Sequence, residues 1–269
     1  KDPATFAEVS RELRCVVREN GVNLVHCHHR MAALYCRLAL PKGVRAVATA
    51  HNVFRGGRVG TRFLYRGMPV AACGGRVHEN LVGYYGLPEG LVTLIPNSVP
   101  AFGTPVEPIA EVAACPEGVL RIGFVGRLSE QKGVAYLVDA MGALAERGTC
   151  VRCFIMGDGE LDSELRERAA NSPARDCIVF MGRRADSQNF LSQVDVCAIP
   201  SLWEGLPLVL LEAFSVGTPV VASACDGILD VVRDGENGLL VRPGDAGALA
   251  DGIERLCKDG ARGNTRSRV

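Results

Sequence analysis

The stretch Glu204-Gly-Leu-Pro-Leu-Val-Leu-Leu-Glu212 decides how the rest of the chain is interpreted. Proline is favoured in the first turn of a helix, so Pro207 and the leucines after it predict a helix from Leu206 to Val216. The two acids are eight positions apart, which corresponds to a rise of roughly 12 Å in a helix. That length is comparable to the reach from a ribose across a pyrophosphate to a sugar, so one acid could hold each end. The alternative is an exposed loop acid followed by an acid on a helix surface.

Length and charge set the first limits on fold and function. The chain has 269 residues, which exceeds the usual size of one domain and predicts two compact units. Hydrophobic residues make up 48% and charged residues 22% of the sequence, a composition typical of globular proteins. Lys plus Arg and Asp plus Glu both number 30, so the formal net charge is zero. Because there is no overall basic field, we expect no nucleic-acid partner, and any electrostatic function has to be local.

Neither the cysteines nor the histidines have the pattern of a metal site. The 11 cysteines lie mostly in apolar runs, so we expect reduced, buried thiols. Cys150-Val-Arg-Cys153 has redox or zinc spacing, but no second Cys pair or Cys/His pair follows at finger distance. His26-Cys-His28-His29 offers four ligands, yet alternate residues of a strand face opposite sides, so the set does not converge without a turn. We therefore expect no metal and no cofactor, and a local site role stays open for His28 or His29.

Hydrophobic segments give an expected location. No apolar run approaches the roughly 18 residues of a membrane-spanning helix, and the N-terminus carries no signal pattern. The expected location is the cytoplasm, and peripheral association with the inner face of the membrane stays open.

Apolar, β-branched runs alternate with helical patterns along the chain, which predicts an α/β fold with parallel sheets. The second half contains six strand candidates, enough for a doubly wound sheet, at 119–125, 151–156, 177–180, 194–199, 219–222 and 238–241. The first half offers four strands, at 22–27, 44–50, 69–73 and 91–96, and helices at 5–19, 30–40 and 76–85. We predict a partial N-terminal Rossmann-like domain over 1–98, a proline-rich linker over 99–118, a C-terminal domain over 119–258 and a tail over 259–269. The missing opening strands and the start at Lys1 predict truncation at the N-terminus. The last helical pattern, Ala246 to Cys257, runs into the tail without a further strand or long helix, which predicts truncation at the C-terminus as well.

A second constellation follows the first strand of the second half. Gly126 comes directly after this strand, at the carboxyl end where open α/β sheets place ligands. Arg127 and Lys132 bracket the start of a helix predicted at 134–146, whose free N–H groups and dipole favour an anion. These residues indicate a pyrophosphate site. Taken alone, a solvated Arg/Lys pair in a surface turn is the commoner outcome.

Five motifs occur in one order in the second half: Phe124-Val-Gly-Arg-Leu-Ser-Glu-Gln-Lys-Gly133, Met156-Gly-Asp-Gly-Glu-Leu161, Pro200-Ser-Leu-Trp-Glu-Gly-Leu-Pro207 leading to Glu212, Gly217-Thr-Pro-Val-Val221 and Gly235-Glu-Asn-Gly-Leu-Leu240. On these motifs, residues 120–242 resemble the donor-binding domain of the family 4 retaining glycosyltransferases, which have the two-domain GT-B fold. Each motif alone is weak, whereas five in the family's order and approximate spacing make a specific signal.

The resemblance implies a donor-binding role for the opening stretch. Glu204 would bind hydroxyls of the donor sugar, and the backbone from Gly205 through Leu206 and Pro207 to Leu208 would face the sugar and phosphate. Glu212 would bind the ribose diol, since a carboxylate accepts two hydrogen bonds at once.

The resemblance also implies roles outside this stretch. Gly157 would lie near the nucleotide. Arg183 would stack on the base, with an exposed surface arginine as an equal alternative. His51, at the end of the strand 44–50, would orient the donor sugar, whereas a lone histidine there is more often a satisfied surface residue. Asp226-Gly-Ile-Leu-Asp230 departs from the family's more usual Gly-Gly-x-x-Glu, which affects the sugar-side details.

By resemblance, the expected reaction moves a hexosyl unit from a UDP- or GDP-linked sugar to an acceptor hydroxyl with retention. The partners would be a nucleotide sugar donor and a carbohydrate or lipid-linked acceptor, in cell-surface polysaccharide or glycolipid synthesis. The predicted catalytic residues are His51, Arg127, Lys132 and Glu204. One alternative is a module that binds nucleotide sugars without transferring them. A dinucleotide-dependent oxidoreductase would share the architecture, but no Gly-x-Gly-x-x-Gly follows an opening strand with an acid about twenty residues later.

Overall fold

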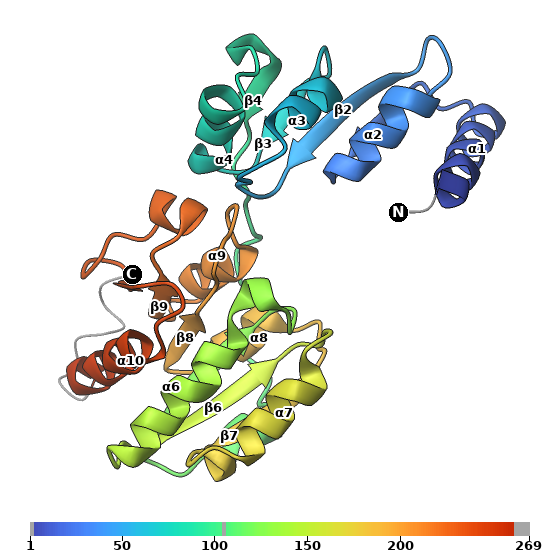
Figure 1. Cartoon of the computed structure of the whole chain (residues 1–269). Coiled ribbons are helices and arrows are strands. Elements are labelled where there is room, and N and C mark those ends of the chain that lie inside the picture. Colours follow the sequence, from blue (N-terminus) through green and yellow to red (C-terminus); the bar gives the residue numbers. More distant parts are fainter. Residues whose placement is uncertain (1–2, 104–105, 261–269) are drawn as a thin grey trace. The chain divides into compact units, whose positions relative to one another are not determined.

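The computed structural model describes residues 3–103 and 106–260. The chain divides into two compact units, and the boundary along the sequence lies between Asn97 and Ser98. Each unit contains a parallel β-sheet with helices in its crossover connections (Figure 1). The α/β fold with two Rossmann-like sheets is therefore confirmed.

The first unit is built on a four-stranded parallel sheet with the order β1-β2-β3-β4. Its strands are β1 (Leu24–Cys27), β2 (Arg45–Ala50), β3 (Val70–Ala72) and β4 (Val92–Leu94). Its helices are α1 (Pro3–Glu19), α2 (Arg30–Ala39), α3 (Arg58–Tyr65) and α4 (Gly75–Glu79), the last continued by a π-helical turn at Asn80–Tyr84. A 3-10 turn at Glu89–Leu91 precedes β4. All four predicted strands are present, while α3 was not predicted.

The second unit is a doubly wound domain with a six-stranded parallel sheet in the order β10-β9-β8-β5-β6-β7. Its strands are β5 (Leu120–Val125), β6 (Val151–Met156), β7 (Ile178–Gly182), β8 (Val196–Ile199), β9 (Val220–Ser223) and β10 (Leu239–Val241). Its helices are α5 (Ala110–Ala113), α6 (Val134–Glu146), α7 (Asp162–Ala170), α8 (Ser187–Leu191), α9 (Leu208–Ser215) and α10 (Ala246–Gly260). Strand β5 pairs with β6 on one side and β8 on the other, so the direction of winding reverses there. Such a switch point is where this class of sheet binds ligands.

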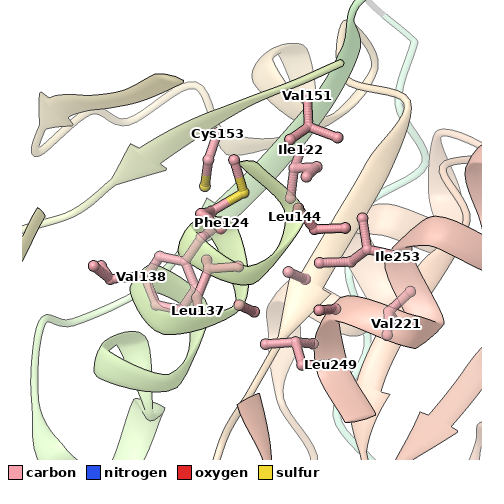
Figure 2. Close-up of a cluster of buried hydrophobic side chains, with 14 of the residues drawn as sticks. Ile122, Phe124, Leu137, Val138, Leu144, Val151, Cys153, Val221, Leu249 and Ile253 are labelled. Atoms are coloured by element: carbon pink, nitrogen blue, oxygen red, sulfur yellow. The ribbon is translucent and has the colours of Figure 1, made fainter. Parts of the chain in front are cut away.

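The core of the second unit lies on both faces of its sheet. On one face, α6 packs against α7 and α10, and Figure 2 shows Leu137 and Leu144 of α6 near Leu249 and Ile253 of α10. Four side chains of α6 form a buried apolar stripe and are at most 1% exposed, namely Val134, Leu137, Met141 and Leu144. Burying one such side chain fully contributes about 1.5–3 kcal/mol, so this face fixes α6 on the sheet.

Residues 107–115, within the stretch 99–118 that was predicted to be a linker, pack on the second unit. Ile109 and Val112 are buried in the core on the face opposite α6. The Ile109 N–H donates to Gln193 Oε1 at 2.9 Å, and the Glu107 N–H donates to Asn189 Oδ1 at 2.9 Å. Side chains in α8 and just after it therefore bind the backbone of these residues, which do not pair with a strand. Most of the predicted tail, 261–269, lies outside the described residues.

Within residues 3–103 and 106–260, none of the helices combines enough length with enough apolar character to cross a membrane.

Candidate functional site

The loops after the strands of the second sheet meet at one edge, because all six strands are parallel. Most of the predicted site residues of this unit lie in these loops or at the start of the helix that follows. Gly126 follows β5, Gly157 follows β6, Arg183 follows β7, and Glu204 lies between β8 and α9. The structure therefore gathers at one edge residues that are far apart in the sequence.

The loops after β5 and β6 are joined through their backbones. The Gly126 N–H donates to the Met156 carbonyl at 3.0 Å, and the Leu128 N–H donates to the Asp158 carbonyl at 2.7 Å. Gly157 has a φ of 153°, and a Cβ atom there would lie 1.8 Å from the Gly126 carbonyl oxygen. Only glycine fits, since any side chain would push the two loops apart.

The loops on either side of the switch point are joined by an ion pair. Lys132 Nζ, beside the start of α6, lies 2.5 Å from Glu204 Oε1, and Ser201 Oγ donates to the same oxygen at 2.8 Å. The Lys132 and Glu204 side chains are 23% and 5% exposed. Gln131 Nε2 also donates to the Trp203 carbonyl at 3.0 Å. The pair therefore places one cation and one carboxylate side by side in a largely buried position at the switch point.

The two predicted phosphate-binding cations have different surroundings. Lys132 faces Glu204, so part of its charge is already compensated. Arg127 is exposed and forms no ion pair within the part of the chain that the structure describes. Its guanidinium is therefore available to an anion from solvent.

Helix α9 begins later than predicted, and this corrects the geometry of the opening stretch. The helix starts at Leu208, and Pro207 has an extended backbone with φ −70° and ψ 128°. Glu204 thus lies in a loop, and the helical rise of roughly 12 Å does not apply to the two acids. The loop before α9 packs closely on Gly227, because a Cβ there would lie 1.2 Å from the Gly205 carbonyl oxygen.

Asp226 is a site residue whose role the sequence did not reveal. Its side chain accepts a hydrogen bond from the Glu204 N–H at 3.3 Å. Its φ of 36° lies in the left-handed region that favours glycine, so the backbone is strained there. One feature of the sequence could have identified Asp226: it replaces the glycine that is usual in the family. A glycine at such a position indicates a left-handed backbone conformation. Ser201 was missed as well, although it stands three residues before Glu204 in the same motif.

The remaining residues of the opening stretch differ in exposure. Gly205, Leu206 and Pro207 are buried, whereas the Leu208 side chain is 50% exposed. Glu212 is half-buried on α9, and this burial raises the pKa of its carboxyl because it disfavours the charged form. A hydrogen bond with Ser187 lowers that pKa and partly opposes the effect.

Arg183 lies apart from the ion pair at the switch point. It follows β7, which is the edge strand and the third strand from β8 in the sheet order. With neighbouring strands about 4.8 Å apart, this corresponds to about 14 Å along the sheet. Arg183 is exposed and has no acidic partner among the described residues, while its neighbour Arg184 pairs with Asp186 at 2.8 Å.

In the first unit, His51 belongs to a group of three histidines. His51 Nε2 and His28 Nδ1 are 3.0 Å apart, and the rings of His26 and His28 lie 4.2 Å apart. Burial lowers the pKa of His51, and the neighbouring His28 and His26 lower it further. His51 is therefore neutral near pH 7. His28 was missed as its partner, although both residues follow neighbouring parallel strands.

His29 and the other residues of the segment His26-Cys27-His28-His29 have other surroundings. His29 caps α2, because its Nδ1 accepts a hydrogen bond from the Met31 N–H at 3.1 Å. Cys27 is buried while His26 and His28 are exposed, as the strand alternation predicts. Across the described residues, no group of three or more His, Cys, Asp or Glu side chains could hold a metal ion.

Comparison with known proteins gives the same family over both units. The family model described as "Glycosyl transferases group 1" matches residues 120–259, which is more than half of the chain. The model described as "Glycosyltransferase Family 4" matches residues 1–101.

Individual proteins agree with these matches. The amylovoran biosynthesis glycosyltransferase AmsK of Erwinia amylovora is 35% identical over 145 residues, covering 51% of this chain and 36% of AmsK. The putative glycosyltransferase EpsF of Bacillus subtilis is 27% identical over 284 residues, covering 98% of this chain and 72% of EpsF. The chain thus spans only about a third of the first of these two relatives.

Among solved structures, Anabaena HepE in complex with UDP-glucose superposes with a TM-score of 0.78 at 23% identity, covering 98% of this chain and 75% of HepE. At this identity the likeness shows the fold, which is that of the GT-B glycosyltransferases. From the family models, the motifs and the fold together, the chain belongs to the group 1, or family 4, glycosyltransferases.

Proposed function

We propose that the chain transfers a hexosyl unit from a UDP- or GDP-linked sugar to an acceptor hydroxyl, with retention of the anomeric configuration. The observation that carries the proposal is the buried pair of Lys132 and Glu204. It places a cation and a carboxylate at the switch point, where a diphosphate and its sugar would lie. The likeness to HepE, whose structure contains UDP-glucose, favours a UDP-linked donor.

The donor sugar would lie against the loop between β8 and α9. Both hydrogen bonds to the Glu204 carboxylate end on Oε1, and neither donor contacts Oε2 among the described residues. We assign Oε2 to a sugar hydroxyl, which would donate to it. The backbone from Gly205 to Leu208 would face the sugar and phosphate, and the exposed Leu208 at the start of α9 would be the nearest helical residue.

The nucleoside would extend along the same edge of the sheet. The half-buried Glu212 carboxylate would accept two hydrogen bonds from the ribose diol. Gly126 and Gly157 would lie beside the nucleotide, in the two loops that their close contact holds together. Arg183 would stack on the base from the end of β7.

The leaving diphosphate would be stabilised by the two cations near α6. Lys132 Nζ has three N–H donors, of which one binds Glu204, so two are available to phosphate oxygens. Arg127 would add an exposed guanidinium, and the amides at the start of α6 would add their dipole. These groups are in place before the sugar–phosphate bond breaks, so they stabilise the charge as it develops.

Retention would follow from attack on the face that the diphosphate leaves. In this step the sugar–phosphate bond breaks, the acceptor oxygen bonds to the anomeric carbon, and the acceptor proton passes to a phosphate oxygen. His51 would orient the donor sugar. Because its pKa is lowered, it would act as a neutral imidazole that donates or accepts one hydrogen bond.

The acceptor class and location complete the proposal. The acceptor would be a carbohydrate or a lipid-linked glycan used in cell-surface polysaccharide or glycolipid synthesis. The reaction would take place in the cytoplasm, with a lipid-linked acceptor reached at the inner face of the membrane.

Release of nucleoside diphosphate from candidate donors tests the proposal. The purified chain is incubated with UDP-glucose or GDP-mannose, with and without simple sugar acceptors. We expect Arg127→Ala to lower the rate at saturating donor by roughly 10²–10³. Arg175→Ala removes an equally exposed arginine far from the switch point and serves as the control. An unchanged rate in Arg127→Ala would remove this residue from the mechanism. Binding of a nucleotide without release from any donor would instead identify a module that only binds nucleotide sugars.

A further inference from the structure

The first unit has a charge asymmetry that the overall balance hides. Between Glu19 and Glu79 the sequence has no acidic residue. The same stretch contains nine basic residues, namely Arg30, Arg37, Lys42, Arg45, Arg55, Arg58, Arg62, Arg66 and Arg76. A chain with zero formal net charge therefore carries a strongly positive segment within one compact unit.

Helix α3 concentrates this charge on one exposed side. At 3.6 residues per turn, Arg58, Arg62 and Arg66 form one row along the helix, and Val59 and Phe63 form the adjacent row. The three arginines are exposed, Val59 is 85% exposed and Phe63 is 50% exposed. We call these five residues, together with the exposed Arg55 before the helix, the α3 surface.

The other side of the helix fixes it to the unit. Thr61 and Tyr65 are buried, and Arg30 Nη1 donates to Thr61 Oγ1 at 3.2 Å. The segment before the helix is held as well, because Tyr85 Oη donates to the Gly56 carbonyl at 3.0 Å. The α3 surface is therefore presented by a packed helix rather than by a loose loop.

The charge of the α3 surface is not neutralised by the chain. Arg55, Arg58, Arg62 and Arg66 form no ion pair within residues 3–103 and 106–260. The nearby contacts are of other kinds: Arg37 lies 5.2 Å from the Phe63 ring centre and donates to the Arg66 carbonyl at 2.5 Å. Arg58 lies 5.9 Å from the Tyr84 ring centre. Aromatic rings hold these guanidinium groups without removing their charge.

We infer that the α3 surface docks on a membrane that contains anionic lipid. A helix with arginines beside exposed apolar side chains is suited to the boundary between headgroups and acyl chains. There Val59 and Phe63 would leave water, while the arginines would bind lipid phosphates. Nucleic acid fits less well, because an exposed valine and phenylalanine in the middle of the surface gain nothing from a phosphate backbone.

This inference goes beyond the transfer reaction and does not depend on it. Docking needs neither donor nor acceptor, so it can be measured on the free chain. The outcome would bear on the acceptor, because a docked first unit would meet lipid-linked glycans at the membrane surface.

Co-sedimentation of the full chain with vesicles tests the inference. The vesicles contain either phosphatidylcholine alone or equal parts of phosphatidylcholine and phosphatidylglycerol. We expect binding to the mixed vesicles at about 0.1 M salt and loss of binding at about 1 M, where the Debye length falls to about 3 Å. Arg58→Gln/Arg62→Gln should lower the partition coefficient about 30-fold, since each arginine near an anionic surface contributes about fivefold.

Two further variants separate the contributions to docking. Val59→Ser/Phe63→Ser keeps the charge and should lower partitioning about tenfold, because it removes the apolar contact. Arg11→Gln/Arg18→Gln removes the same charge from exposed positions on α1 and should change partitioning by less than about threefold.

Three results would overturn the inference. These are equal binding to both kinds of vesicle, no binding to mixed vesicles at the lower salt, and an Arg58→Gln/Arg62→Gln variant that binds as the parent does. Binding of a single-stranded oligonucleotide without vesicle binding would assign the surface to nucleic acid instead. Unchanged far-ultraviolet circular dichroism of each variant would show that folding is intact.

Discussion

Substituting Lys132 by methionine tests the ion pair at the switch point. The change leaves the Glu204 carboxylate without its cation while its side chain is only 5% exposed. Removing one partner of a buried pair typically costs 3–5 kcal/mol of stability, because a charge stays buried without compensation. Lys132 is 23% exposed, and Ser201 still donates to the carboxylate, so we expect the lower end, about 3 kcal/mol.

The cost should depend on the charge of the partner. Lys132→Met/Glu204→Gln replaces the charge by a neutral amide, so about half or more of the lost stability should return. Lys258→Met is the control, because its pair with Glu254 lies at the surface and should contribute far less to stability.

Urea unfolding monitored by tryptophan fluorescence measures these differences. The chain has one tryptophan, Trp203, which directly precedes Glu204 and therefore reports on the second unit. A loss below about 1 kcal/mol in Lys132→Met would show that the pair behaves like a surface ion pair. A double variant that is no more stable than the single variant would also refute the reasoning.

Three other substitutions have clear expected outcomes. Gly227→Ala should destabilise the second unit by about 3 kcal/mol or more, because its Cβ would overlap the Gly205 carbonyl oxygen at 1.2 Å. Gly217→Ala, where no atom lies within 4 Å, should cost only the strain of its positive φ, about 1–2 kcal/mol, and equal losses in urea unfolding would contradict the close approach. The lowered pKa of His51 means that its contribution to stability is present above about pH 6.5 and is lost as the pH falls toward its folded pKa. His28→Asn should raise the His51 pKa in an NMR titration, and an unchanged value would show that the two rings are not coupled.

Local patterns predicted the sheets well because strand-forming runs are a property of short segments. Helix α3 was missed because its own segment has no local pattern that favours a helix. Its surroundings, Arg55-Gly-Gly-Arg-Val-Gly-Thr61, combine glycines and β-branched residues, which have low helix propensity. The helix is stabilised instead by the burial of Thr61 and Tyr65 against the rest of the first unit, and such packing is not visible in a local pattern.

The start of α9 shows a second limit of local patterns. Proline favours the first turn of a helix, whereas the residue before a proline is biased toward an extended backbone. In the structure Pro207 itself is extended and directly precedes α9. The loop before the helix packs on the backbone of Gly227, more than twenty positions away, and such a contact is not visible in a local pattern.

Which site residues contact one another depends on the order of the strands in the sheet, and local sequence patterns do not reveal that order. Lys132 and Glu204 are 72 positions apart and meet because β5 pairs with β8. His28 and His51 are 23 positions apart and meet because β1 pairs with β2. The motifs identified most of these residues as candidates, but only the sheet topology shows which of them lie together.

Calorimetric titration of the chain with UDP, GDP and ADP tests the central claim most directly. The claim predicts that one nucleotide binds, and that Glu212→Ala weakens this binding at least about tenfold, or about 1.4 kcal/mol. Glu167→Ala, which removes an exposed acid from α7, should leave the affinity unchanged. Absence of binding by the folded chain, or equal affinity in Glu212→Ala and the parent, would contradict a nucleotide site at this edge of the sheet.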